Sequence, residues 1–189
     1  QKVLEAISNK DCDYMYYTNE ENFSKIPGMP IAYWVSENVL VNYEKGKVLG
    51  SIAYPKTGMT TGDNNRFLRL WSEVSINLCK FDCENNLQGI SSGLKWFPYC
   101  KGGGFRRWYG YNEYLVNWEN DGYEIKNNIK ENGLKAASVR SEHLYFKKFI
   151  TWSAVTSGKF SCRYVEKGFL FDSGGSSISV NLKDKYLLA

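Results

Sequence analysis

Histidine is nearly absent from this sequence, and its absence limits the catalysis that the chain can perform. The only imidazole is that of His143, and the run Ser141-Glu142-His143 does not match a known nucleophile motif. Carboxylates such as Glu113 and Asp121 lie among aromatic residues, but nothing in the sequence pairs two of them as a general acid and base. The glycine and lysine order of a P-loop is also missing. The sequence therefore predicts no catalytic residues in this chain.

Cysteine is scarce, and its pattern argues against both a disulfide framework and a metal centre. The chain has 5 cysteines, an odd number, and only Cys79 and Cys83 stand close together. No second pair follows, whereas a structural zinc site usually needs four Cys or His ligands at recognisable spacing. We therefore expect reduced cysteines, as in the cytosol, and no metal site. The role of Cys79 and Cys83 stays open.

Long hydrophobic runs are missing as well. No stretch approaches the roughly 20 apolar residues that span a bilayer, and no charged-then-apolar leader opens the chain. These absences predict no membrane partner and a cytoplasmic location. The chain begins at Gln1 without Met and ends at Leu187-Leu188-Ala189 in the middle of a pattern. We therefore expect an excised part of a larger protein.

The composition fits one α+β domain over residues 1–189, a size at which folding hides about 70% of the unfolded chain's surface. Aromatic residues reach 16%, which favours strands and flat contact surfaces over a helical bundle. Short apolar runs bounded by glycine and polar residues predict many short strands in a mixed sheet, with a few helices. Residues 48–54 fit either a helical turn or a strand. Expected helices cover residues 2–10, 36–46 and 122–129, and expected strands cover 14–17, 66–71, 95–99, 114–118, 149–153, 160–164 and 168–171.

The excess positive charge is concentrated in one segment. The whole chain has a net charge of +4, and the stretch from Ser91 to Asn112 holds four basic residues and no acidic one, namely Lys95, Lys101, Arg106 and Arg107. The remainder therefore sums to zero, which indicates a patch that faces an anion. Glycines 102–104 would let backbone N–H groups approach a phosphate, and rings such as that of Trp108 could stack on bases. The alternative is a hairpin with a solvated basic turn and core aromatics.

Two polar loops are further candidates. The loop Thr61–Arg66 is either functional or a tight turn in which Asp63 or Asn64 accepts backbone hydrogen bonds. The segment Asp172–Ser177 could form an anion-binding nest of backbone N–H groups. It could equally form a turn after a strand, and the turn is the favoured interpretation.

Several long motifs, in order, resemble PglX-type methyltransferases, the adenine-specific DNA methyltransferases of BREX phage-defence systems. The first to stand out is GMTTGDNNRFLRLW at residues 58–71, and the motifs are specific together because several long ones occur in order. The resemblance covers roughly residues 23–178. The other matching segments are IPGMPIAYWVS at 26–36, KWFPYCKGGGFRRWY at 95–109, NWENDGYEIK at 117–126, ITWS at 150–153, SGKFSCR at 157–163 and GFLFDSGGSS at 168–177.

This resemblance implies DNA recognition without catalysis. In that family the region follows the methyltransferase core, and it is similar to the target recognition domains of type I specificity subunits and type IIG restriction-modification enzymes. The core would carry an N-P-P-Y type motif for the flipped adenine and a glycine-rich loop for S-adenosylmethionine, and neither occurs here. The implied partners are double-stranded DNA and the methyltransferase core of the same parent chain, with S-adenosylmethionine as a cofactor of the parent only. Departures from the family pattern are Cys100, where Asn is expected, and Gly104, where Glu or Asp is common.

The same resemblance suggests residues that contact DNA. The expected set is Lys101, Arg106, Arg107, Trp108, Arg66, Arg69, Asn64, Asn65 and Lys95. The basic residues of segment 101–107 would bind phosphates or base edges, and the asparagines would pair with adenine. One of the arginines at 66 and 69 could instead pair with an acid. Motifs shared by a whole family can also be scaffold that positions DNA without reading it.

A second interpretation is a carbohydrate- or protein-binding module that uses exposed aromatic side chains. It explains the Trp and Tyr content but not the acid-free basic segment. Salt-sensitive binding to duplex DNA separates the two interpretations. A self-contained enzyme is disfavoured, because it would need its own cofactor motif and its own acid or base.

Overall fold

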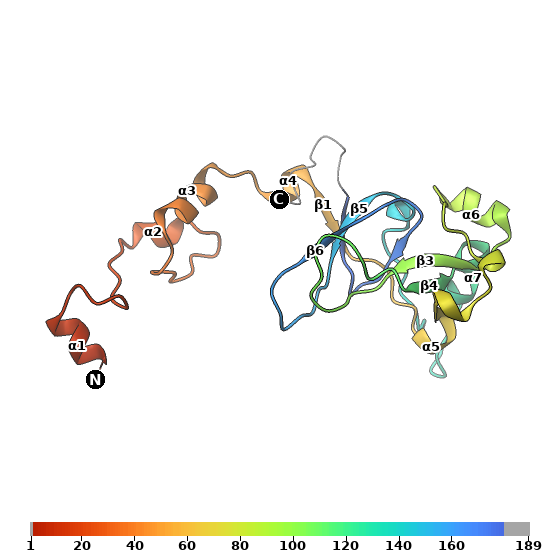
Figure 1. Ribbon diagram of the computed structural model, residues 1–189, viewed down its shortest axis with the longest axis horizontal. Coiled ribbons are helices and arrows are strands. Elements are labelled where there is room, and N and C mark those ends of the chain that lie inside the picture. The colour runs from red at the N-terminus through yellow and green to blue at the C-terminus, as the bar shows by residue number, and fades with distance from the viewer. Residues whose placement is uncertain (1, 180–189) are drawn as a thin grey trace. The chain divides into compact units, whose positions relative to one another are not determined.

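The computed structural model describes residues 2–179, apart from the side chain of Ile52 (Figure 1). Its internal contacts divide the chain into two units, Gln1–Ile52 and Ala53–Ala189. Helices and two sheets are both present, so the expected α+β class is confirmed. That one domain covers residues 1–189 stays a prediction.

The first unit consists of short helices and loops. The helices are α1 (Lys2–Ser8), α2 (Glu21–Ser24), α3 (Glu37–Lys45) and α4 (Leu49–Ile52). Helix α3 begins after Ser36 and ends at Gly46, as expected from the sequence. The strand expected at residues 14–17 is wrong, because no strand in the described part of this unit can pair with it and Tyr17 stays exposed. Ile26 and Leu40 are the only buried hydrophobic side chains among residues 2–51.

The second unit holds two four-stranded sheets. The first has the order β1-β8-β5-β6 and is antiparallel throughout, while the second has the order β2-β4-β3-β7 and is mixed, because β7 runs parallel to β3. Most strands expected from residue 95 onward occur within two residues of their expected bounds. The strands are β1 (Tyr54–Lys56), β2 (Leu68–Leu70), β3 (Trp96–Cys100), β4 (Tyr114–Asn117), β5 (Phe149–Trp152), β6 (Cys162–Val165), β7 (Leu170–Phe171) and β8 (Ser177–Ser179).

Short helices fill the connections of this unit, and two of them change the expected boundaries. The strand expected at residues 66–71 is shorter in the structure and forms β2, because helix α5 (Asn64–Phe67) takes its first two residues and a 3-10 turn (Trp71–Glu73) begins directly after β2. The Asp63 side chain accepts a hydrogen bond from the Arg66 N–H (3.0 Å) and so caps α5. The remaining helical segments are Ile76–Leu78, α6 (Asn86–Ser92), α7 (Glu119–Lys126) and Glu142–Leu144.

Helix α7 begins three residues before the expected start at residue 122, and it is kinked there. Asn120, Asp121 and Gly122 all have left-handed backbone angles, with φ of 50°, 60° and 67°. A Cβ on Gly122 would lie 2.5 Å from the Trp118 ring, so glycine is required at this point. Helices α6 and α7 lie side by side next to β3 and β4 (Figure 1).

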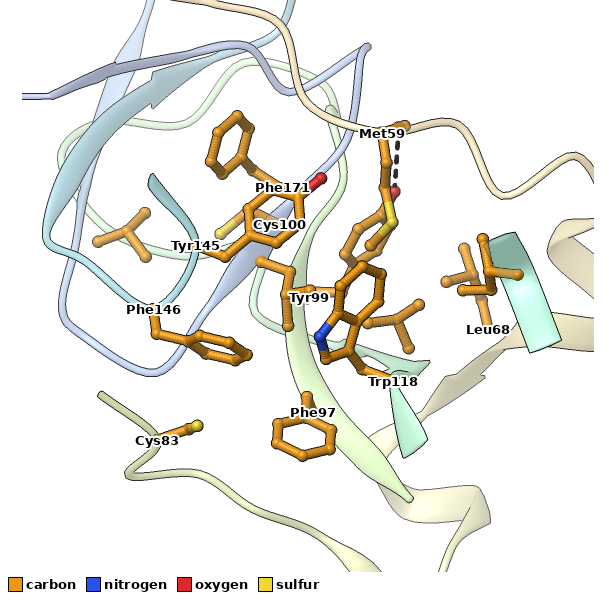
Figure 2. Close-up of a cluster of buried hydrophobic side chains, with 14 of the residues drawn as sticks. Met59, Leu68, Cys83, Phe97, Tyr99, Cys100, Trp118, Tyr145, Phe146 and Phe171 are labelled. Atoms are coloured by element: carbon orange, nitrogen blue, oxygen red, sulfur yellow. Dashed lines mark hydrogen bonds between the residues drawn. The ribbon is translucent and has the colours of Figure 1, made fainter. Parts of the chain in front are cut away.

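The hydrophobic core draws side chains from both sheets. Phe97 and Tyr99 of β3 point into it together with Tyr145 and Phe171, as Figure 2 shows. The rings of Tyr145 and Phe171 meet edge to face, with centroids 5.3 Å apart. Part of the aromatic content is thus core, which leaves the exposed aromatic rings as candidates for binding.

Candidate nucleic-acid interface

Residues 101–112, here called the arginine loop, connect β3 to β4 and are docked against the β5–β6 hairpin. The Trp108 carbonyl accepts a hydrogen bond from the Tyr164 N–H of β6 (2.8 Å). The Arg106 N–H donates to Ser161 Oγ (3.3 Å), and the Gly103 N–H donates to Ser153 Oγ (2.9 Å). These contacts fix the backbone of the loop, so the side chains of Arg106 and Arg107 project from a supported segment.

The glycines of the arginine loop are needed for packing inside the protein. A Cβ on Gly102 would lie 2.4 Å from the Gly174 carbonyl oxygen, and one on Gly103 would lie 2.9 Å from the Tyr111 ring. The expectation that these glycines offer their N–H groups to a phosphate is therefore wrong for Gly103, whose N–H is already bonded to Ser153.

Arg106 and Arg107 are exposed and lie over aromatic rings. The Arg107 guanidinium is 5.2 Å from the Phe105 ring centre and 5.8 Å from that of Trp108, whose side chain is 53% exposed. Arg106 lies 4.9 Å from the ring of Tyr111. None of the ion pairs among residues 2–179 includes Arg106 or Arg107. Guanidinium groups without an acid among these residues, held on aromatic rings, suit phosphates and the faces of bases.

A neighbouring loop, residues 153–161, extends this surface, and the sequence analysis missed it. The Arg106 N–H donates to Ser161 Oγ of this loop (3.3 Å), so the two loops are in contact. Lys159 is exposed in it, together with Val155 and Phe160. A signal was available, because no acidic residue occurs between Glu142 and Glu166 while four basic ones do.

Lys101 stands at a surface cleft that brings four of the expected residues together. Asn64, Asn65, Arg69 and Lys101 line a cleft of about 410 Å³, and the Lys101 ammonium lies 5.2 Å from the ring centre of Tyr114. Asn64 Oδ1 accepts a hydrogen bond from Thr61 Oγ1 (2.7 Å), which orients the amide. Arg69 donates from Nη1 to the carbonyl oxygens of Asn65 and Leu68, both at 2.6 Å. The cleft thus holds positioned amide and guanidinium groups.

Arg66 and Lys95 form a separate group around an acid. The Glu124 carboxylate lies 3.3 Å from Arg66 and 3.7 Å from Lys95, and Lys95 also lies 3.8 Å from Glu119. A hydrogen bond from Asn117, followed by the charges of Lys95 and Arg66, lowers the pKa of Glu124. Lys95 and Lys101 flank opposite ends of β3, so the expected set does not meet at one place.

The side chain of Asp172 accepts hydrogen bonds from its own turn and from Tyr99. Its Oδ1 accepts a hydrogen bond from the Gly174 N–H (2.6 Å), and its Oδ2 accepts one from the Tyr99 hydroxyl (2.8 Å). Burial and the nearby Asp172 carboxylate raise the pKa of Tyr99 well above its ordinary value. The segment Asp172–Ser177 is therefore the expected turn. The Gly174 N–H, which a nest would offer to an external anion, donates to the Asp172 carboxylate instead.

The cysteines are free, and the C-x3-C pair serves packing. Cys83 lies in the core opposite Phe97 and Phe146 (Figure 2), and burial raises the pKa of both Cys79 and Cys83. Among residues 2–179 no cluster of three or more His, Cys, Asp or Glu side chains is arranged to hold a metal ion. In the same described range, no helix has the length and apolar character needed to cross a membrane.

Comparison with known proteins gives two long alignments, although no protein-family model matches the chain. The chain is 44% identical over 188 residues to the adenine-specific methyltransferase PglX of Lacticaseibacillus casei (strain Zhang), which covers 96% of this chain and 15% of that protein. It is 41% identical over 168 residues to the adenine-specific methyltransferase BrxX of Escherichia coli O9:H4 (strain HS), which covers 89% of this chain and 13% of that protein. The expected resemblance to PglX-type methyltransferases is confirmed, and the chain spans 15% and 13% of the length of these curated relatives.

Proposed function

We propose that the chain is the DNA-recognition part of a bacterial adenine-specific DNA methyltransferase of a phage-defence system, and that it has no methyl-transfer site of its own. The observation that carries the proposal is the exposed pair Arg106 and Arg107, which lies on aromatic rings without an acidic partner among residues 2–179. The names of both relatives support a methyltransferase as the parent. S-adenosylmethionine and the flipped adenine would then bind in another part of that parent, in the cytoplasm where its DNA substrate lies.

The arginine loop and the neighbouring loop would bind the DNA backbone. Arg106, Arg107 and Lys159 neutralise phosphates and release counterions, which makes the affinity depend on salt. Phosphate contacts of this kind set the register of the protein on the duplex. The exposed rings of Phe105 and Trp108 add stacking or apolar contacts at the same surface.

The cleft beside Lys101 would read base edges. Its amide groups, from Asn64 and Asn65, can form paired hydrogen bonds with adenine, and the Arg69 guanidinium can do so with guanine. Because α5 and β2 carry these groups, the scaffold holds them in place. Arg66 and Lys95 contribute less, since Glu124 neutralises part of their charge.

The test is a titration of labelled duplex DNA with the chain and with the double variant Arg106→Ala/Arg107→Ala, at low and at physiological salt. A matched control is Lys45→Ala/Lys47→Ala, which removes two exposed charges from the first unit. We expect at least tenfold weaker binding for the arginine variant, and a salt slope that is shallower by roughly two, since each phosphate contact contributes about 0.9. Equal affinities for the two double variants would show that the arginine loop is not the interface.

The first unit supports a second candidate function, which is protein binding. Tyr16, Tyr33 and Trp34 are exposed and in mutual contact, with ring centroids 5.5 Å and 4.9 Å apart. Residues 1–52 contain five lysines, no arginine and seven acidic residues, a balance that disfavours DNA. On this assignment Tyr33→Ser/Trp34→Ser leaves the duplex affinity of the chain unchanged, whereas loss of affinity would assign these rings to the DNA interface.

A further inference from the structure

Arg163 of β6 is a buried cation without an anionic partner among residues 2–179. Arg163 is only 1% exposed. Its Nη2 donates one long hydrogen bond, to Ser153 Oγ at 3.5 Å. The Nε and Nη1 atoms have no hydrogen-bond partner within residues 2–179, and no ion pair in this range includes Arg163. Buried charges are usually paired and hydrogen-bonded, because an unpaired one costs several kcal/mol of desolvation.

The Tyr111 ring covers this guanidinium from the side of the arginine loop. Arg163 lies 5.1 Å from the ring centre, and Arg106 lies 4.9 Å from the same centre. The ring also packs against the backbone of Gly103 and Gly104, as the short Cβ distances at both positions require. Two like charges therefore share one aromatic ring, an arrangement that favours an anion close to both.

The backbone at Tyr111 is suited to a change of position. Tyr111 itself has a left-handed φ of 61°, and Gly110 before it has a φ of 117°. A left-handed backbone conformation is strained for tyrosine, and such strained residues concentrate at ligand clamps. Movement of the Tyr111 ring away from Arg163 would expose the Nε and Nη1 donors, which have no hydrogen-bond partner within residues 2–179.

We propose that Arg163 and Arg106 form a binding site for one phosphodiester group, which the Tyr111 ring closes when no anion is bound. The inference rests on the proposed function, since DNA supplies the phosphate. A guanidinium presents its donors as a planar fork that matches two phosphate oxygens. At this site the low dielectric strengthens the attraction, and the anion compensates a charge that has no acidic partner among residues 2–179.

The site is tested with Arg163→Met, a variant of similar volume without charge, and with Lys148→Met as a control that removes an exposed lysine paired with Glu166. Free of ligand, Arg163→Met should unfold at a temperature equal to or above that of the wild type. Its affinity for duplex DNA should fall at least tenfold, while Lys148→Met changes affinity less than threefold. Inorganic phosphate should raise the melting temperature of the wild type and not that of Arg163→Met.

The outcomes separate this inference from the proposed function. If the wild type binds DNA through Arg106 and Arg107 but Arg163→Met binds equally well, the phosphodiester site is wrong and DNA recognition stands. If the wild type does not bind DNA at low salt, the proposed function of the isolated chain is wrong. The effect of inorganic phosphate on the melting temperatures of the wild type and Arg163→Met then decides whether the site binds a phosphate. If Arg163→Met does not fold, Arg163→Lys and Tyr111→Leu decide. The lysine variant should lose most of the phosphate response, and the leucine variant should keep it, while the reverse pattern overturns the site.

Discussion

The guanidinium of Arg66 lies 3.3 Å from the carboxylate of Glu124. This ion pair separates basic residues that are paired with an acid from basic residues that are not, a difference that the sequence alone does not show. Arg66 and Lys95 share the charge of one glutamate, whereas Arg106 and Arg107 belong to none of the ion pairs among residues 2–179. Fewer basic side chains are therefore available to bind an anion than the number of basic residues suggests.

Glu124→Gln should release the two cations. We expect duplex affinity at low salt to rise about two- to fivefold, because the variant removes one negative charge beside Arg66 and Lys95. The cost in stability should stay within about 1 kcal/mol, since the pairs are partly exposed and screened by solvent. Titration at two salt concentrations measures the gain. Unchanged affinity would place Arg66 and Lys95 outside the DNA interface.

The same variant gives a pH prediction. The Asn117 hydrogen bond and the charges of Lys95 and Arg66 lower the pKa of Glu124 in the folded protein. A lowered folded-state pKa contributes stability above the unfolded value, which is about 4.3, and this contribution is lost as the pH falls through the folded value. The difference in melting temperature between wild type and Glu124→Gln should therefore be constant near pH 7 and shrink below about pH 4. A difference that grows on acidification contradicts this assignment.

Gly102→Ala should destabilise the second unit. The added Cβ meets a backbone carbonyl at 2.4 Å, and backbone cannot yield as a flexible side chain does. We expect a loss of about 1–3 kcal/mol in the free energy of unfolding. Gly158→Ala is the matched control, because its Cβ would find no atom closer than 3.6 Å. Chemical denaturation of both variants measures the contrast, and equal stabilities would count against the packing described for the arginine loop.

Cysteine alkylation should separate two classes of thiol in the native chain. Cys12 and Cys162 are partly exposed, whereas Cys79, Cys83 and Cys100 are buried, and burial raises the pKa of Cys100 to about 12. At pH 8 iodoacetamide should modify the first two and spare the other three until denaturant is added. Peptide mass spectrometry reads each site. Rapid native modification of Cys100 would show that the core next to the arginine loop opens.

The parts of the fold that local pattern determines were predictable. Helix α3 has a Ser before its start and a Gly at its end, and β3 and β4 are aromatic or apolar runs, so all three were expected near their observed bounds. The strand at residues 14–17 was not realised, because a strand depends on a partner that the sequence around it does not reveal. The strand expected at residues 66–71 is confirmed only at Leu68–Leu70, because the Asp63 cap competes with the strand preference of the residues that follow it.

The sequence predicts the exposed charges of the candidate site, Arg106 and Arg107, but it does not predict the buried charge of Arg163. Arg106 and Arg107 stand out because no acid is nearby in sequence. Among residues 2–179 no acid pairs with Arg163, and the sequence does not reveal this, since it depends on what β6 packs against. The sequence predicts that Gly102 and Gly103 let a phosphate approach the backbone. In the structure a Cβ at these positions would meet Gly174 and Tyr111, whose proximity arises only from the tertiary fold.

The pairing of β1 with β8 has a consequence for biosynthesis. Tyr54 pairs with Ser179, so the first strand of its sheet has no neighbour until nearly the whole second unit has left the ribosome. At ordinary rates of translation that interval is on the order of ten seconds. Late closure of a sheet by non-local pairing also slows folding itself. Truncation before residue 177 would leave β1 and β5 as open edges, which favours aggregation over folding.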